Sequence, residues 1–179
     1  AEKAFAGVSR SSAPAPAPAN YTGGDSREIR ELEQAHLVMG FDGIGFDDDD
    51  YYPLGVLSTA LGGGMSSRLF QEVREKRGLV YSIYTFSSAY QDGGLFGLYA
   101  GTGEDEVAEL ISVVCDELKN VAADPLAEDE ITRARAQIKA GVLMSLESTS
   151  SRAERIARHL QVYDRVIPNA ANQTLVVFV

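Results

Sequence analysis

The segment from Ser66 to Ser82 holds the side chains whose types and spacing could do chemistry. Arg74 is near the end of an expected helix, and Tyr81 is at the start of an expected strand, beyond Gly78. An arginine and a tyrosine that reach one point from two rigid elements can hold a carboxylate or a developing oxyanion. The alternative is that Arg74 bonds helix carbonyls and Tyr81 packs in a sheet, and spacing alone favours this alternative.

Three other groups carry reactive atoms, but their neighbours in the sequence predict structural roles. His36 lies in an apolar stretch and is expected to be a core or half-buried residue. His159 lies among charged residues of a helix, which favours a solvated helix face. Cys115 falls on the core side of another helix, where a thiol acts as a small apolar side chain. The two histidines do not have metal-binding spacing, and one cysteine excludes an intrachain disulfide or a multi-cysteine metal site.

The elements that must position Arg74 and Tyr81 follow from apolar spacing and turn residues. His36 to Phe41 predicts a central strand. Four acids directly before Tyr51 predict a helix N-cap rather than a calcium loop, because the Asp-x-Asp-x-Asp-Gly spacing is absent. Three glycines end that helix and predict a left-handed C-cap. A second helix is then expected to begin at Ser66 or Ser67 and to end before Gly78.

The second half of the chain predicts a hairpin and then helices. Tyr81 to Ser87 and Leu95 to Ala100 are rich in aromatic and apolar residues and flank a Gln-Asp-Gly-Gly turn, which favours a β-hairpin. Apolar residues then recur at three- and four-residue steps in three stretches, 107–121, 131–146 and 153–163. Thr174 to Val179 predicts a last strand. This order indicates an α+β fold, with a largely antiparallel sheet and helices packed on one face.

The composition excludes several classes of function. The 179 residues are one domain's worth of chain, and 16 Lys and Arg against 26 Asp and Glu give a formal net charge of −10. Such an acidic surface repels the phosphate groups of nucleic acid, so basic peptides are the more favourable class of binding partner. No stretch approaches the about 20 apolar residues of a membrane span. We therefore expect no nucleic-acid and no membrane partner, and a cytoplasmic location.

The first 26 residues differ from the rest of the chain. Ala1 to Ser9 has the apolar spacing of a helix end, and Ser11 to Asn20 alternates Ala and Pro, which favours an extended linker. We expect residues 1–26 to be the end of a preceding domain with its linker, and residues 27–179 to be a separate C-terminal domain. Composition alone equally allows the tail of one complete protein.

A long motif from Leu61 to Ser82 resembles the signature of the second, C-terminal domain of the pitrilysin/insulinase (M16) metallopeptidases. It runs Leu-Gly-Gly-Gly-Met-Ser-Ser-Arg-Leu-Phe-Gln-Glu-Val-Arg-Glu-Lys-Arg-Gly-Leu-Val-Tyr-Ser. The similarity extends from about Ala1 to Asp164. Within the family the chain is most similar to bacterial relatives of the β subunit of the mitochondrial processing peptidase. The resemblance implies the M16 type of α+β roll.

The resemblance also implies a function, that of a zinc-dependent metalloendopeptidase that cleaves peptides or presequence-like substrates. In the family, the first domain carries zinc on an inverted His-x-x-Glu-His motif, and the metal activates a water. The second domain closes the chamber and faces the zinc with an arginine and a tyrosine. Those positions match Arg74 and Tyr81, which the resemblance assigns to contacts with the substrate carbonyl and the transition state.

This chain departs from the family pattern because it contains no His-x-x-Glu-His in either direction. It is therefore expected to bind no cofactor and to be inactive alone. Zinc is expected in an N-terminal domain of the same protein, which would be its partner together with a peptide substrate. The family commonly pairs halves or subunits, so a homodimer and a heterodimer both remain open.

The alternative function is that of a non-catalytic partner or structural subunit. The tail at 166–179 lacks the helix that the family usually places after Tyr163.

Overall fold

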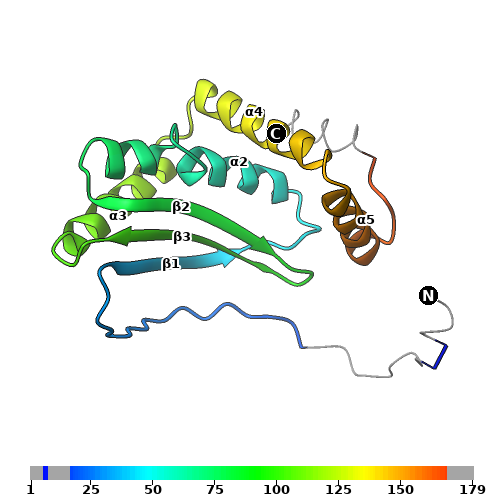
Figure 1. Cartoon of the computed structure of the whole chain (residues 1–179), viewed down its shortest axis with the longest axis horizontal. Helices are drawn as coiled ribbons and strands as arrows, with labels where there is room; N and C mark the ends of the chain where they lie inside the picture. Colours follow the sequence, from blue (N-terminus) through cyan, green and yellow to red (C-terminus); the bar gives the residue numbers. More distant parts are fainter. Residues whose placement is uncertain (1–5, 8–16, 169–179) are drawn as a thin grey trace.

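The computed structural model describes residues 6–7 and 17–168. The helix end expected at 1–9 lies mainly outside these residues, and the strand expected at 174–179 lies entirely outside them. The described part is a three-stranded sheet with helices on one side (Figure 1). This confirms the α+β class. In chain order, the elements are β1 (Ala35–Gly43), α2 (Tyr51–Gly62), the π-helix η1 (Phe70–Glu75), β2 (Val80–Ala89), β3 (Gly94–Thr102), α3 (Val107–Ala123), α4 (Glu128–Ser145) and α5 (Thr149–Tyr163).

The strands pair antiparallel in the order β1-β3-β2. The predicted hairpin is confirmed as β2 and β3. The prediction of β1 as a central strand is wrong for the described residues, where β3 is central and β1 lies at the edge. Along β1, Leu37 and Met39 are half-buried against the core, whereas His36 and Val38 are exposed. Because alternate side chains of a strand point to opposite faces, helices cover only one face of β1.

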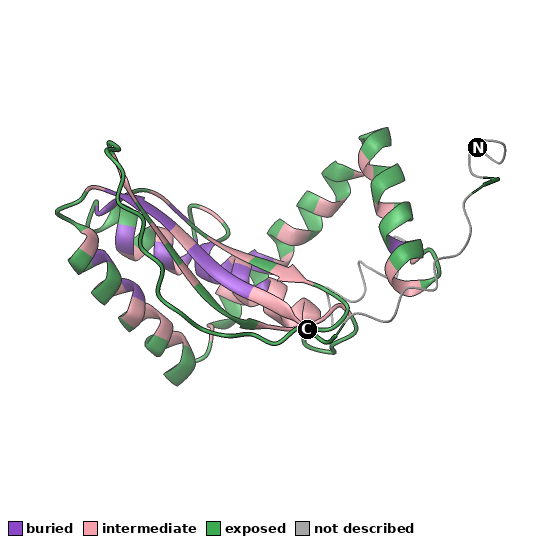
Figure 2. Ribbon diagram, turned by 90° about the horizontal axis from the view of Figure 1, so that it is seen from below, coloured by how far each residue is buried: buried purple, intermediate pink, exposed green. Residues whose placement is uncertain are grey.

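The main core lies between the sheet and the layer formed by α2, η1 and α3 (Figure 2). Side chains from each of these layers are at most 1% exposed, among them Leu61, Val73, Leu98 and Leu110. Each aliphatic side chain of this size stabilises the fold by roughly 1.5 to 3 kcal/mol. A second, smaller cluster joins α2 to α4 and consists of Val56, Ala60 and Ala134. Helix α4 therefore packs on α2, and α4 and α5 together extend beyond the sheet (Figure 2).

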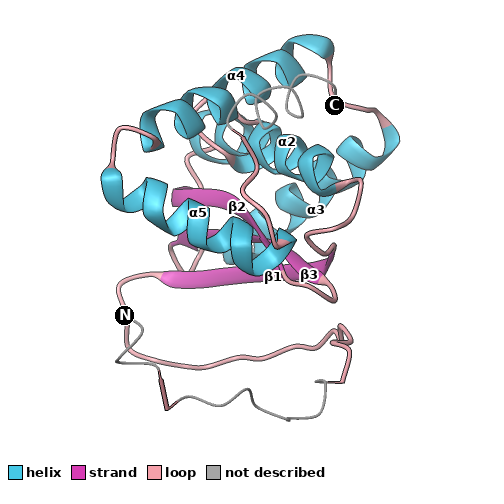
Figure 3. Ribbon diagram, turned by 90° about the vertical axis from the view of Figure 1, so that its right-hand side faces the viewer, coloured by secondary structure: helices cyan, strands magenta, loops and turns pink. Residues whose placement is uncertain are grey.

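Residues 17–34 contain neither helix nor strand and run as an extended segment below β1 (Figures 1 and 3). Two hydrogen bonds connect this segment to the sheet. The Tyr21 hydroxyl donates to the Gly40 carbonyl at 2.7 Å, and the Ala19 N–H donates to the carboxylate of Asp92 in the hairpin turn at 2.6 Å. The division of the chain at residue 26 stays a prediction.

The three glycines after α2 do not form the left-handed C-cap that the sequence predicts. Gly63 has φ −84°, and the described residues with positive φ are Gly78 and Asp164. The space around the glycines explains their presence instead. A Cβ on Gly62 would lie 2.6 Å from the backbone nitrogen of Thr85, and a Cβ on Gly63 would lie 2.6 Å from the Cα of Thr59. The first two glycines therefore allow α2 to end in close contact with β2 and with its own last turn.

The acidic run before α2 marks the helix start as predicted, but without the expected side-chain cap. Asp50 is the N-cap residue, and its carboxylate accepts no capping hydrogen bond. The carboxylate of Asp48 instead accepts the N–H of Asp50 at 2.8 Å. This bond orders the loop that leads into α2.

Candidate functional site

Arg74 lies in a π-helix, where the sequence predicts an α-helix that continues to Arg77. In η1 the Lys76 N–H donates to the carbonyl of Gln71, five residues back, at 3.0 Å. A π-turn holds more residues than an α-turn, so it changes the direction of the side chains that follow, and such turns are frequent at functional sites. The motif residues around Arg74 therefore form an irregular element rather than a standard helix.

The side chain of Arg74 is exposed. Its guanidinium lies over the ring of Phe70, 4.8 Å from the ring centroid. It forms no hydrogen bond or ion pair with any residue that the structure describes. The two neighbouring cations differ, because Lys76 and Arg77 both pair with Glu72, and Arg77 also donates to a helix carbonyl. These two cations hold the pKa of the Glu72 carboxyl below its usual value.

A short connection joins η1 to β2, and Gly78 makes it possible. Gly78 has φ +66°, a conformation that disfavours a residue with a Cβ. Its N–H donates to the Arg74 carbonyl, and the Leu79 N–H donates to the Val73 carbonyl, both at 3.0 Å. The Gly78 bond is the single-bond closure of a helix end by a left-handed glycine, and the Leu79 bond reaches one residue further back than in the usual two-bond closure. The prediction that Gly78 ends the helix is confirmed.

Tyr81 lies in a β-bulge at the start of β2. Val80 pairs with Thr102 and Ser82 pairs with Gly101, so Tyr81 is the extra residue on its strand. Val80 is buried against the helices, whereas the Tyr81 side chain is 63% exposed. Its hydroxyl has no hydrogen-bond partner among the described residues. Bulges are common next to active sites because they redirect a side chain.

Arg74 and Tyr81 therefore stand at the facing ends of two elements that pack together. Val73, Leu79 and Val80 belong to the main core and fix η1 against β2. The two candidate side chains form no hydrogen bond with each other, and both are exposed to solvent. The alternative from the sequence, an arginine bonded to helix carbonyls and a tyrosine packed in the sheet, is not what the structure contains. A guanidinium and a phenol placed in this way can bind a carboxylate or a polarised carbonyl oxygen.

The structure corrects the expected surroundings of both histidines. His36 is exposed rather than in the core, and its Nδ1 lies 2.8 Å from the hydroxyl of Tyr99, which stacks on Tyr84. His159 is buried rather than solvated, at 8% exposure, and its Nδ1 accepts the N–H of Ile167 at 3.2 Å. Burial, helped by the charge of Arg155, lowers the pKa of His159. Cys115 is half-buried, so it is only partly the core residue that was expected.

The described residues contain no group of three or more His, Cys, Asp or Glu side chains that could hold a metal ion. His36 and His159 lie on β1 and α5 and bond to different partners, so they do not form a shared ligand set. Within residues 6–7 and 17–168, no helix combines the length and the apolar character needed to cross a membrane.

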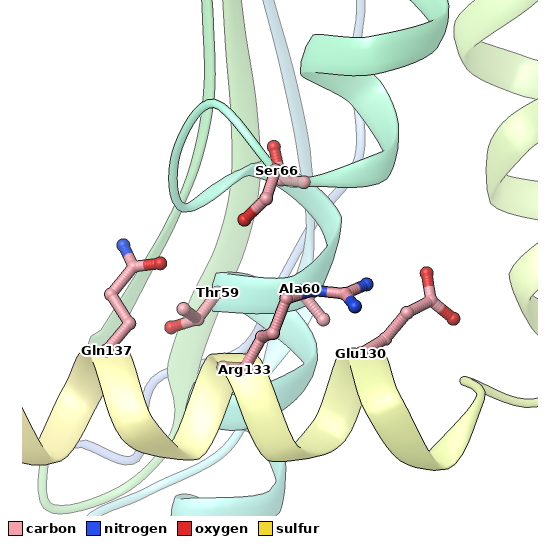
Figure 4. Close-up of a pocket in the computed structure, with 8 residues that line it drawn as sticks. Thr59, Ala60, Ser66, Glu130, Arg133 and Gln137 are labelled. Carbon is pink, nitrogen blue, oxygen red and sulfur yellow. The ribbon is translucent and has the colours of Figure 1, made fainter.

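The sequence did not point to one further contact, an ion pair between Arg68 and Glu130. This pair borders an open groove of about 630 Å³ between η1, the end of α3 and the start of α4. A neighbouring cavity of about 10 Å³ lies between α2 and α4 and is lined by Thr59, Ser66 and Gln137 among others (Figure 4). Such a cavity has room for about one water. Neither space is lined by Arg74 or Tyr81.

Comparison with known proteins gives one family. The family model described as the peptidase M16 inactive domain matches residues 1–138. An uncharacterized zinc protease of Streptomyces coelicolor is 48% identical over 129 residues, which cover 72% of this chain and 28% of that protein. An uncharacterized zinc protease of Rickettsia bellii is 36% identical over 168 residues, which cover 93% of this chain and 40% of that protein. The chain thus spans about a third of the length of these relatives.

Solved structures show the same fold. The peptidase M16 inactive domain from Pseudomonas fluorescens superimposes with a TM-score of 0.68 at 25% identity, over 81% of this chain and 34% of that one. A protease from Helicobacter pylori superimposes with a TM-score of 0.75 at 22% identity, over 84% of this chain and 36% of that one.

Proposed function

Because this chain belongs to the M16 peptidase family, as the inactive domain of zinc proteases, we propose that it is the zinc-free C-terminal part of a metalloendopeptidase. In this proposal it closes a reaction chamber over a zinc-bearing N-terminal domain of the same protein. It supplies contacts to the substrate rather than the metal. The relatives whose names include zinc protease support this placement, and each of them is longer than this chain.

The observation that carries the proposal is the pair of outward donors on Arg74 and Tyr81. Both belong to the motif Leu61 to Ser82, and both lie beside irregular backbone, a π-helix on one side and a β-bulge on the other. π-turns and β-bulges are both frequent at functional sites, so two of them on either side of one short connection support a functional role. Together they direct a cation and a hydroxyl away from the core.

The chemistry assigned to the two residues is electrostatic. When a peptide bond is attacked, negative charge develops on its carbonyl oxygen. In our proposal the Arg74 guanidinium and the Tyr81 hydroxyl donate hydrogen bonds to the substrate, and these bonds strengthen as that charge develops. Preorganised donors of this kind favour the transition state over the ground state. Neither residue needs to exchange a proton to act in this way.

The described residues do not fit a zinc site, since no cluster of His, Cys, Asp or Glu ligands is present among them. We therefore assign the metal to the N-terminal domain. No chemical step at the metal is assigned to residues of this chain.

The substrate that we propose is an extended basic peptide, such as a targeting presequence, as in a processing peptidase. The formal net charge of −10 supports this choice, because an acidic chamber wall attracts cationic chains. We further propose that the working enzyme pairs two halves or subunits. The cytoplasmic location expected from the sequence stays a prediction.

The proposal is tested by comparing the 179-residue chain with the complete protein, which includes the residues upstream in its gene. Cleavage of a basic peptide is measured for each, with and without a metal chelator. We expect chelator-sensitive cleavage by the complete protein and none by the chain alone. Zinc-dependent cleavage by the purified chain would overturn the assignment.

The second candidate function is a non-catalytic partner or structural subunit of the same fold. The description of the matching family model, an inactive domain, fits this candidate as well as it fits the peptidase. The upstream coding sequence separates the two. An intact inverted zinc motif there supports the peptidase, and a degenerate motif supports the partner subunit. In the second case, Arg74→Ala in the complete protein would have no catalytic effect to measure.

A further inference from the structure

The connection between Arg74 and Tyr81 is held by a residue outside the motif, Thr102. This threonine is the last residue of β3 and is fully buried, at 0% exposure. The other large side chains that are buried to this degree are all aliphatic. Thr102 therefore brings a hydroxyl into a position where a valine would fill nearly the same volume.

The Thr102 hydroxyl has one partner, the backbone carbonyl of Leu79, to which it donates a hydrogen bond of 2.5 Å. Leu79 lies in the connection, 23 residues away in sequence. The N–H of the same residue donates to the Val73 carbonyl in η1. The peptide groups on both sides of Leu79 are therefore fixed, one by the π-helix that carries Arg74 and the other by β3.

Thr102 also lies where the pairing of β2 with β3 becomes irregular. Its Cα partner is Val80, and the next pair along the ladder is Ser82 with Gly101, so Tyr81 is skipped between them. A bulge leaves one residue without a regular ladder partner. The side chain of Thr102 supplies a hydrogen bond to Leu79, the residue directly before β2, at this point.

We propose that Thr102 is a positioning residue, whose hydroxyl fixes the Leu79 carbonyl and thereby sets the direction of Tyr81 relative to Arg74. The role in substrate contact rests on the proposed function, but the control of Tyr81 by Thr102 does not. A displacement of about 1 Å at a catalytic contact can lower a rate about 100-fold, so a single buried hydrogen bond suffices for a measurable effect.

The fold offers a matched control in Thr85. This residue also lies in a strand, β2, and its hydroxyl also donates to a backbone carbonyl, that of Ser58 in α2, at 2.6 Å. Both side-chain hydrogen bonds of Thr85 within the described residues are with Ser58, and neither involves the connection between Arg74 and Tyr81. Thr102→Val and Thr85→Val each remove one hydroxyl and leave one carbonyl without its partner, and Thr85→Val also removes the acceptor of the Ser58 hydroxyl, 3.1 Å away. A purely structural role predicts a loss of stability in both variants and no effect on Tyr81 that is specific to Thr102.

The first measurement uses the 179-residue chain with fluorinated tyrosine, whose Tyr81 signal is assigned from its loss in Tyr81→Phe. We expect Thr102→Val to shift or broaden the ¹⁹F signal of Tyr81, Thr85→Val to leave it in place, and Thr102→Ser to restore it. An unchanged Tyr81 signal in Thr102→Val, or an equal shift in both valine variants, overturns the proposal. If Thr102→Val does not fold, Thr102→Ala replaces it and is compared with Thr102→Ser, from which it differs by the hydroxyl alone.

The second measurement uses the complete peptidase. We expect Thr102→Val to lower kcat by roughly 10- to 100-fold with little change in KM, and Thr102→Ser to recover most of the rate. In the double variant with Tyr81→Phe, the loss should not exceed that of Tyr81→Phe alone, because Thr102 acts through Tyr81. Full additivity, or an equal loss in Thr85→Val, overturns the positioning role. Wild-type turnover in Tyr81→Phe instead overturns the proposed function, and the ¹⁹F signal then still decides the role of Thr102.

Discussion

Arg68 and Glu130 join two parts of the fold that are 62 residues apart, through two parallel hydrogen bonds of 2.6 and 2.7 Å. Their side chains are 21% and 17% exposed, so the pair is partly shielded from water. The carboxylate of Glu130 also accepts the N–H of Ala127, at the start of α4. One side chain therefore both caps α4 and connects this helix to the turn before η1.

Glu130→Gln should lower the free energy of unfolding by about 1 to 3 kcal/mol, since it weakens hydrogen bonds between charged partners. Urea denaturation of the 179-residue chain measures the change. Asp129→Asn is the matched control, because the Asp129 and Arg133 pair lies on the exposed side of the same turn. A loss in Glu130→Gln no larger than in Asp129→Asn contradicts the assigned role.

The same pair predicts a dependence on pH. Arg68 lowers the pKa of Glu130 below its ordinary value of 4.5. A carboxyl whose folded-state pKa is depressed stabilises the fold fully above its unfolded-state pKa, and this contribution is lost as the pH falls toward the folded-state pKa. The stability difference between wild type and Glu130→Gln should therefore be constant near pH 7 and shrink below about pH 4.5. A difference that is unchanged at pH 3 contradicts this linkage.

Gly62→Ala should destabilise the chain, whereas Gly55→Ala in the same helix should not. A Cβ on Gly62 would meet the backbone of β2 at 2.6 Å, and the space around Gly55 is open. Overpacking against backbone typically costs about 1 to 3 kcal/mol, and glycine to alanine at an open helix position gains up to about 1 kcal/mol. Thermal unfolding of the two variants checks the prediction. Equal melting temperatures would mean that the close approach of α2 to β2 is not as described.

The sequence predicts the elements of this fold better than their local geometry. Strand β1, the hairpin and the helices follow from apolar spacing and turn residues, which depend on neighbours along the chain. The role of Gly62 does not, because it depends on Thr85, a contact between distant segments. The π-turn around Arg74 and the bulge at Tyr81 each insert one residue into a regular pattern, and no spacing rule predicts such an insertion.

The same limit applies to single side chains. His159 has charged neighbours in sequence, yet α5 turns it toward the interior, where it bonds Ile167. Arg74, by contrast, lies among mainly charged residues and is exposed. For His159 the sequence neighbours therefore give the wrong exposure, because the rotation of α5 and not the local composition decides which side chains face the interior.

His159 should make the chain less stable in mild acid. Burial lowers its pKa in the folded state below the ordinary 6.5. The unfolded chain then binds a proton that the folded chain does not, so stability is lost as the pH falls through 6.5 toward the folded-state pKa. Thermal unfolding between pH 8 and pH 5 should show a steeper fall for wild type than for His159→Gln. An equal fall in wild type and His159→Gln would contradict the prediction.

Arg74→Ala and Tyr81→Phe should lower kcat of the complete peptidase without unfolding it. Both side chains are exposed and bond to no described residue, so their removal leaves the core unchanged. Loss of one donor to a developing oxyanion lowers a rate by about 100- to 1,000-fold. Lys76→Ala is the control, since Lys76 is an exposed cation of the same turn that pairs with Glu72. Steady-state kinetics and melting temperatures are measured together. Equal kcat in Arg74→Ala and Lys76→Ala would show that the position of Arg74 carries no catalytic meaning, and a large fall in melting temperature would assign it to stability instead.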